Sequence, residues 1–273
     1  MSLASRTTPE AKTVVRSRQR RKGPAPEEER HLAIGLSDPD TLALLREGEV
    51  IGGQRIPWSS NYTFLVHIDA GEQSYIRAVY KPRDGERPLY DFPNGNLYKR
   101  EYAAYLLSRA LGWPNIPATL VREGPYGVGS MQTYVETDPE ITYFDLIGDR
   151  AEDLRSLAVF DLLTNNADRK GGHCLLGADG AIWSIDHGLT FHPYPKLRTV
   201  MLEFWGTPIP DPLLADVEAL IVSLEGRSGD VADLEELLDG QEVEALRRRA
   251  ESVLDNPVIP ELDPRRDVPW PLV

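Results

Sequence analysis

The amino-acid sequence predicts an α+β protein with two lobes, a β-rich N-lobe followed by a mostly helical C-lobe. Short strand-like apolar segments, separated by turns rich in Gly and Pro, run from residue 50 to residue 135. One amphipathic segment, Leu97–Leu111, interrupts them, with apolar residues at helical spacing and Gly112 at its end. Beyond residue 150 the apolar residues recur mainly at helical spacing, which predicts the second lobe.

The N-lobe is expected to span residues 31–136 and to hold an antiparallel sheet together with the helix at 97–111. Its strands are expected at 49–56, 62–68, 74–81, 119–122 and 129–135, after a short helix at 38–47. The basic segment 1–30 lacks periodicity and is expected to be a disordered arm. The Pro-rich tail, residues 256–273, is expected to wrap the surface.

The C-lobe is expected to span residues 137–255, with helical segments at 150–165, 212–224 and 231–254, a break at Gly226–Gly229 and a candidate break at Gly240. Between the first two helices a Gly-Ala-Asp-Gly turn joins two short apolar segments, which indicates a β-hairpin. The hairpin would place the polar loops at Asp168 and Asp186 at the same end of a two-stranded ribbon. Two carboxylates held together in this way can bind a divalent cation and orient a reacting hydroxyl.

The composition is that of a globular protein from which stable membrane or nucleic-acid binding is not expected. Of the 273 residues 41% are apolar, and the N-terminus lacks the apolar core of a signal peptide. Residues 1–23 carry a net charge of +6, which leaves −19 for the rest of a chain whose total is −13. An acidic body binds anionic lipid or nucleic acid poorly; the basic arm could bind either, but it is expected to be a solvated tail.

The cysteine content limits which disulfide and metal sites the chain can form. The single cysteine, Cys174, excludes an intrachain disulfide and any metal site built from several cysteines. Its place at the start of an apolar segment predicts a buried, inert thiol. A cytoplasmic location is expected.

Four motifs occur in order between residues 50 and 200. They are Val79-Tyr80-Lys81-Pro82 at a strand end, Glu101 in the amphipathic helix, Asn166-Ala167-Asp168-Arg169, and Ile185-Asp186-His187-Gly188. Together they resemble the phosphatidylinositol 3-/4-kinase superfamily, and are similar to its type II 4-kinase branch, to HipA-type bacterial kinases and to a subgroup of actinobacterial proteins. The resemblance implies a two-lobed protein-kinase-like fold that binds ATP and Mg²⁺ (or Mn²⁺) in the cleft between the lobes.

The resemblance implies that Lys81 reaches the α- and β-phosphates of ATP and that Glu101 pairs with it. Two other interpretations stay open. Lys81 is also what an edge strand uses to discourage aggregation. Glu101 could instead be a surface residue paired with Arg100, although neighbours in a helix do not face each other.

The remaining nucleotide contacts are expected from two segments. The loop with Ser59, Ser60 and Asn61 lies between the first two strands, where kinases place a phosphate-covering loop, but a plain hairpin loop is an equal alternative. The strand that ends near Gln132 and Tyr134 is in the hinge position, where backbone groups would hold adenine.

By the same resemblance, Asp168 orients or deprotonates the attacking hydroxyl, and Lys170 neutralises charge on the transferred phosphoryl group. Arg169 would anchor the loop. The alternative is that Asn-Ala-Asp-Arg only caps the preceding helix.

The metal is expected on Asp186, because Mg²⁺ prefers carboxylate oxygen. Kinases commonly place a metal-binding Asn five residues after the catalytic Asp, whereas this sequence has His173. Imidazole suits softer metals such as Mn²⁺, so His173 is expected either to ligate the metal or to pack and bond to the backbone.

The function that the sequence favours is ATP-dependent phosphotransfer to a hydroxyl of a protein or of a small, inositol-type alcohol. The alternatives are a nucleotide-binding pseudokinase, an AMP-transferring protein of the same fold, and an interaction protein with a vestigial cleft. After Asp186, three basic residues could guide an anionic substrate or belong to an ordinary solvated loop: His192, Lys196 and Arg198.

Overall fold

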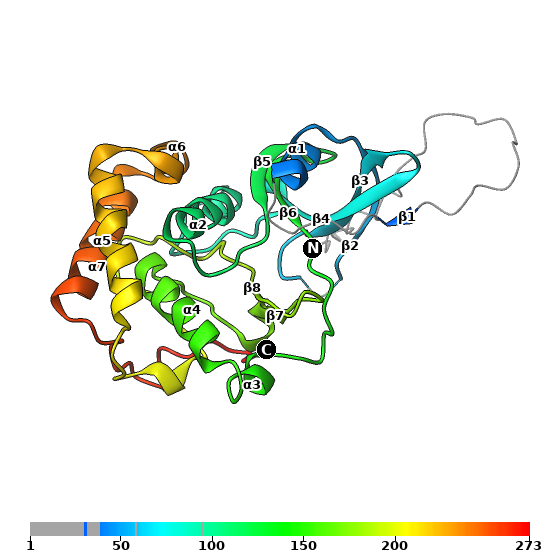
Figure 1. Cartoon of the computed structure of the whole chain (residues 1–273). Helices are drawn as coiled ribbons and strands as arrows, with labels where there is room; N and C mark the ends of the chain where they lie inside the picture. Colours follow the sequence, from blue (N-terminus) through cyan, green and yellow to red (C-terminus); the bar gives the residue numbers. More distant parts are fainter. Residues whose placement is uncertain (1–29, 32–38, 58, 94) are drawn as a thin grey trace, which may run out of the picture.

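The computed structural model describes residues 30–31, 39–57, 59–93 and 95–273. The arm predicted at 1–30 lies outside the described residues apart from Arg30, and so does the predicted helix start at Asp38. The chain forms the predicted α+β arrangement, with an antiparallel sheet beside a group of helices (Figure 1).

The main sheet has the order β2-β3-β4-β6-β5. Its strands are β2 (Val50–Arg55), β3 (Phe64–Gly71), β4 (Ser74–Pro82), β5 (Thr119–Gly124) and β6 (Gly127–Thr133), and neighbours run antiparallel. The first three strands form the predicted meander, whereas β6 rather than β5 pairs with β4. A two-residue strand that was not predicted, β1 (Arg30–His31), pairs in parallel with the start of β4.

Helix α2 (Leu97–Leu111) lies between this sheet and the helices of the C-lobe, while α1 (Pro39–Glu47) packs against β3, β5 and β6 (Figure 1). Strand β4 alternates as its sequence predicts: Ile76, Ala78 and Tyr80 are buried on one face. Lys81 therefore projects from the opposite face, at the register position of Ser130 on β6.

The C-lobe contains five helices and a two-stranded ribbon, connected by loops that include short 3-10 turns. The helices are α3 (Tyr143–Leu146), α4 (Ala151–Thr164), α5 (Asp211–Gly226), α6 (Leu234–Leu237) and α7 (Gly240–Asp255), of which α3 and α6 are single turns. The ribbon pairs β7 (Cys174–Leu176) with β8 (Ile182–Ser184), as the hairpin pattern predicts.

The helical region predicted at 231–254 is divided just before Gly240, the position where the sequence offers a break. Asp239 separates α6 from α7 and caps α7, since its carboxylate accepts hydrogen bonds from the N–H groups of Gln241 and Glu242 at 2.8 and 2.9 Å. The tail after residue 256 runs along the C-lobe, where the Leu272 carbonyl accepts a hydrogen bond from the Gly171 N–H at 2.8 Å.

The larger of two hydrophobic clusters among the described residues extends from the sheet through α2 into the helices, so the two lobes share a core. Arg100 on α2 is fully buried at this junction. Its guanidinium pairs with Glu242 on α7 and donates to the Thr190 carbonyl, and it lies 5.2 Å from the Phe92 ring centroid. A buried guanidinium must keep such partners, so Arg100 ties α2 to the C-lobe.

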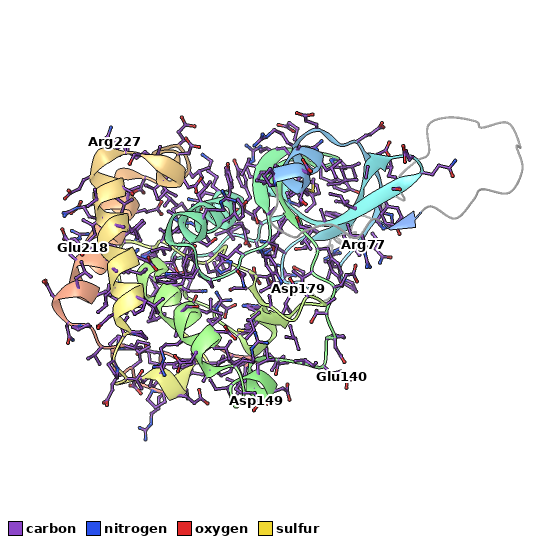
Figure 2. The ribbon with its side chains drawn as sticks, viewed as in Figure 1. Arg77, Glu140, Asp149, Asp179, Glu218 and Arg227 are labelled. Atoms are coloured by element: carbon purple, nitrogen blue, oxygen red, sulfur yellow. The ribbon has the colours of Figure 1, made fainter. Side chains whose placement is uncertain are left out.

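Charged side chains cover the outside of the molecule, as Figure 2 shows for Asp149, Asp179, Glu218 and others. Among the described residues, no helix is both long and apolar enough to cross a membrane.

Replacing Glu242 by Gln should destabilise the fold, because Arg100 would keep its charge in a buried position without a counterion. Removing one partner of a buried ion pair costs about 3–5 kcal/mol, which urea unfolding followed by circular dichroism would measure. Glu244→Gln is the matched control, since Glu244 is an exposed residue of the same helix that pairs with Arg247. Equal unfolding midpoints for the two variants would contradict the assigned role of Arg100.

Candidate functional site

A cleft of about 700 Å³ lies between the sheet and the ribbon of the C-lobe. It gathers every residue predicted for the site except Lys170: Ser59, Ser60, Asn61, Lys81, Glu101, Gln132, Tyr134, Asp168, His173 and Asp186. Lys170 lies directly behind it, with its Nζ atom 3.3 Å from an oxygen of Asp168. Apolar walls come from Val79, Leu97, Val135, Ile185 and Leu189.

The Lys81 side chain bridges two carboxylates. Its ammonium pairs with Glu101 and lies 2.9 Å from Oδ1 of Asp186. Burial disfavours the charged ammonium, but Asp186 and Glu101 together outweigh it and raise the pKa of Lys81. Lys81 is therefore fixed and charged at the centre of the cleft, and not a free lysine on an edge strand.

Glu101 is buried in the middle of α2 and uses both oxygens. One faces Lys81, and the other accepts a hydrogen bond from the His187 N–H at 3.0 Å. Burial raises the pKa of Glu101 and the Lys81 charge works against that rise. The alternative in which Glu101 pairs with Arg100 is wrong, because Arg100 points to the opposite side and pairs with Glu242.

Asp186 follows β8 in a left-handed backbone conformation with φ of 62°. A non-glycine residue rarely adopts this conformation, which is typical of functional turns. The Lys81 ammonium lowers the pKa of Asp186, so this half-exposed carboxylate is ionised. Its second oxygen lies 3.4 Å from Nε2 of His173.

The Asp168 loop begins where α4 ends. Asn165 terminates that helix in the left-handed conformation, and the N–H of Asp168 donates to the Asn166 side chain at 3.0 Å. The Asp168 carboxylate is partly exposed to the cleft. Burial raises the pKa of Asp168, and Lys170 opposes that rise. The helix-capping role that the sequence left open belongs to Asn165, which leaves Asp168 available for chemistry.

A buried ion pair connects the Asp168 loop to the Asp186 turn. Arg169 donates from Nε and Nη2 to the two oxygens of Asp161 at 2.7 and 2.9 Å. Its other contacts reach the Ile185 carbonyl and Nε2 of His187, both at 3.0 Å. Arg169 thus anchors the loop as predicted, and Asp161 and His187 complete the network.

Sequence reasoning missed Asp161 and His187 as parts of the site. Asp161 carried a signal, because it is an acidic residue inside the apolar run 157–163, and a buried carboxylate requires a partner. No sequence pattern marked the role of His187, because its contact with Arg169 forms only when the turn is folded.

His173 faces two groups. The N–H of Lys170 donates to its Nδ1 at 3.4 Å, and Nε2 lies toward Asp186. Burial lowers the pKa of His173 to about 4, so the ring is neutral near pH 7. A neutral imidazole that accepts at Nδ1 carries its proton on Nε2, the ring nitrogen that lies 3.4 Å from an oxygen of Asp186.

The predicted phosphate-covering loop is held by its own side chains. The hydroxyls of Ser59 and Thr63 share a hydrogen bond of 2.8 Å, and Asn61 accepts the Arg87 N–H at 2.9 Å. Ser60 is the exposed member at the cleft. The loop therefore lies over the cleft in a defined shape without glycine.

Two hydrogen bonds limit which groups of the predicted hinge are available to bind adenine. The Gln132 side chain donates to the Thr119 hydroxyl at 2.9 Å, and the Tyr134 N–H donates to the Arg77 carbonyl at 3.0 Å. The Tyr134 N–H is thus already occupied, so an adenine would have to use backbone groups beyond it.

The Asn165 side chain holds the segment after Asp186 in place through three hydrogen bonds. The Asn165 amide donates to the carbonyls of His192 and Tyr194 at 2.8 and 2.7 Å, and its oxygen accepts the Lys196 N–H at 2.8 Å. Lys196 also pairs with Asp91 at 2.8 Å, so it bridges this segment and the loop before α2.

Comparison with known proteins identifies a relative in amino-acid sequence. Protein Rv2133c of Mycobacterium tuberculosis is 42% identical over 279 residues, which cover 88% of this chain and 98% of that protein. The chain belongs to the family of Rv2133c. No protein-family model matches it.

Two solved structures show the fold. The Golgi casein kinase with Mn/ADP bound superposes with a TM-score of 0.53 at 15% identity, covering 86% of this chain and 80% of that one. Hydra Fam20 with sugar superposes with a TM-score of 0.51 at 15% identity, covering 78% and 86%. The fold is therefore kinase-like, as predicted, while the narrower resemblance to phosphatidylinositol 3-/4-kinases stays a prediction.

Cys174, next to His173, can report on the Asp161–Arg169 pair. Its thiol is fully buried, and burial raises its pKa to about 12, so it should resist Ellman's reagent at pH 8. Asp161→Asn would leave Arg169 uncompensated and should speed labelling about tenfold or more through local opening. Asp153→Asn, an exposed change on the same helix, is the control. The same slow labelling in both variants would contradict the bracing role.

Proposed function

We propose that the protein is an ATP-dependent phosphotransferase that acts on a hydroxyl acceptor. The observation that supports this most is the convergence of Lys81, Glu101, Asp186 and Asp168 on one cleft of a kinase-like fold. The cleft volume of about 700 Å³ is within the range of small-molecule sites. The acceptor would be a protein or a small alcohol of the inositol type.

The proposed roles follow from position. Lys81, held by Glu101, would bind phosphate oxygens, and the loop with Ser59, Ser60 and Asn61 would cover them. The hinge after Gln132 and Tyr134 would hold adenine.

Asp168 would take the proton of the acceptor hydroxyl as that oxygen forms its bond to the γ-phosphorus, while the bond to the ADP oxygen breaks. The ammonium of Lys170, 3.3 Å from Asp168, would offset charge on the transferred group.

The donor set fits a hard divalent cation. Among the described residues no group of three or more His, Cys, Asp or Glu could hold a metal by itself. Mg²⁺ in nucleotide sites is usually bound through one or two carboxylates together with substrate phosphates, and Asp186 at the cleft suits that pattern. When bound, the metal would neutralise phosphate charge. The prediction that His173 is a second ligand would require the other tautomer, with the proton on Nδ1 in place of the Lys170 contact.

Turnover of labelled ATP tests the proposal and its alternatives. With Mg²⁺ or Mn²⁺, [γ-32P]ATP should give ADP or labelled protein, and both Asp168→Asn and Asp186→Asn should lose at least about a hundredfold. Asp149→Asn, an exposed change seen in Figure 2, is the control. Transfer of [α-32P] label would indicate AMP transfer, binding without turnover a pseudokinase, and no binding at all would refute the proposal.

The pH dependence of turnover should report Asp168. A base must be ionised, so kcat/KM should fall as the pH drops through the pKa of Asp168, which burial raises above its ordinary 3.8. Lys170 lowers that pKa, so Lys170→Met should move the acidic limb to higher pH. Lys196→Gln should leave the limb in place, because Lys196 is paired with Asp91. An acidic limb that does not move in Lys170→Met would count against Asp168 as the base.

A further inference from the structure

In the cleft, three of the four oxygens of the two central carboxylates accept a hydrogen bond from the chain. The Lys81 ammonium donates to one oxygen of Glu101 and to one of Asp186, the latter at 2.9 Å. The second oxygen of Glu101 accepts the His187 N–H, and the second oxygen of Asp186 lies 3.4 Å from Nε2 of His173. Most of the oxygens that would attract a divalent cation are therefore already in contact with groups of the chain itself.

The Lys81 ammonium also changes the charge that an approaching cation meets. Glu101 and Asp186 contribute two negative charges, and Lys81, which contacts both, cancels one of them. A divalent cation on Asp186 would lie close to the ammonium, and like charges a few ångströms apart repel each other. The Lys81 side chain is 23% exposed and that of Asp186 50%, so water screens this repulsion in part but does not remove it.

Nucleotide phosphates remove this obstacle. They carry several negative charges and offer Lys81 new oxygen partners, so its contact with Asp186 can be exchanged for one with phosphate. The flexible four-carbon stem of lysine allows that exchange while Glu101 keeps its hold. Asp186 is then free to accept a metal that the phosphates also bind.

We propose that Lys81 fills the cation position of the empty cleft, so that a divalent metal reaches Asp186 only together with a nucleotide. The part of this inference that concerns nucleotide rests on the proposed function. Lys81 would then have two roles, the binding of phosphate and the exclusion of free metal. His173 is consistent with this role, because its Nε2 lies 3.4 Å from the oxygen of Asp186 that Lys81 does not contact.

Mn²⁺ binding to the full chain tests this inference without any turnover. Free Mn²⁺ is titrated by electron paramagnetic resonance at pH 8, without nucleotide, against the wild type, Lys81→Met and Lys81→Arg. Lys81→Met should bind Mn²⁺ at least about tenfold more tightly than the wild type, because the competing charge is gone. Lys81→Arg keeps the charge and should bind as weakly as the wild type. Asp186→Asn combined with Lys81→Met should lose the gain.

The controls separate this inference from the proposed function. Lys99→Met alters a lysine of α2 that does not line the cleft, and it should leave Mn²⁺ binding unchanged. Circular dichroism melting confirms that each variant folds, and Lys81→Arg keeps the comparison usable where Lys81→Met does not fold. With the non-hydrolysable analogue AMP-PNP, wild-type Mn²⁺ affinity should rise at least about tenfold.

Two results would overturn the inference. One is free Mn²⁺ binding by the wild type that is as tight as by Lys81→Met; the other is a Lys81→Arg variant that binds Mn²⁺ tightly. A failure of AMP-PNP to bind would instead refute the proposed function, while the nucleotide-free comparison would still decide whether Lys81 excludes the metal.

Discussion

The ammonium of Lys81 is the point at which three distant parts of the chain meet. Strand β4 supplies the lysine, α2 supplies Glu101, and the turn after β8 supplies Asp186. Because each carboxylate depends on the same cation, none of the three elements can move alone without leaving a charge poorly compensated. This one interaction therefore links the sheet, the helix and the ribbon across the cleft.

Behind the cleft, buried polar contacts hold the two functional loops in a fixed relation. Arg169 connects Asp161 on α4 with the turn before Asp186, and Asn165 binds the segment after it. Arg100 connects α2 to the C-lobe in the same way. Buried charges are costly unless all their partners are present, so these contacts favour one arrangement of the loops over its alternatives. A site whose residues come from several loops depends on such preorganisation.

The sequence predicted the order of the elements from local patterns, and it predicted the residues that line the cleft from their resemblance to kinase motifs. Alternation along β4, the helical spacing from Leu97 and the Gly-rich turn before β8 are readable within a few residues. The position of β6 beside β4 was not predictable in this way, since α2 separates the two strands along the chain. Asp161 was noticeable as a charge within an apolar run, but its partner eight residues later was not.

By itself the sequence determined that Asp168 and Asp186 lie at one end of a ribbon and that Lys81 ends a strand. Only the tertiary structure decided that Glu101 faces Lys81 while Arg100 faces Glu242, because the packing of α2 sets the direction of each side chain. The tertiary structure also decided which groups the two ring nitrogens of His173 contact. Its residue type suggested a metal ligand, whereas in the fold Nδ1 accepts the Lys170 N–H and Nε2 lies 3.4 Å from Asp186, and both contacts exist only once the loop is folded.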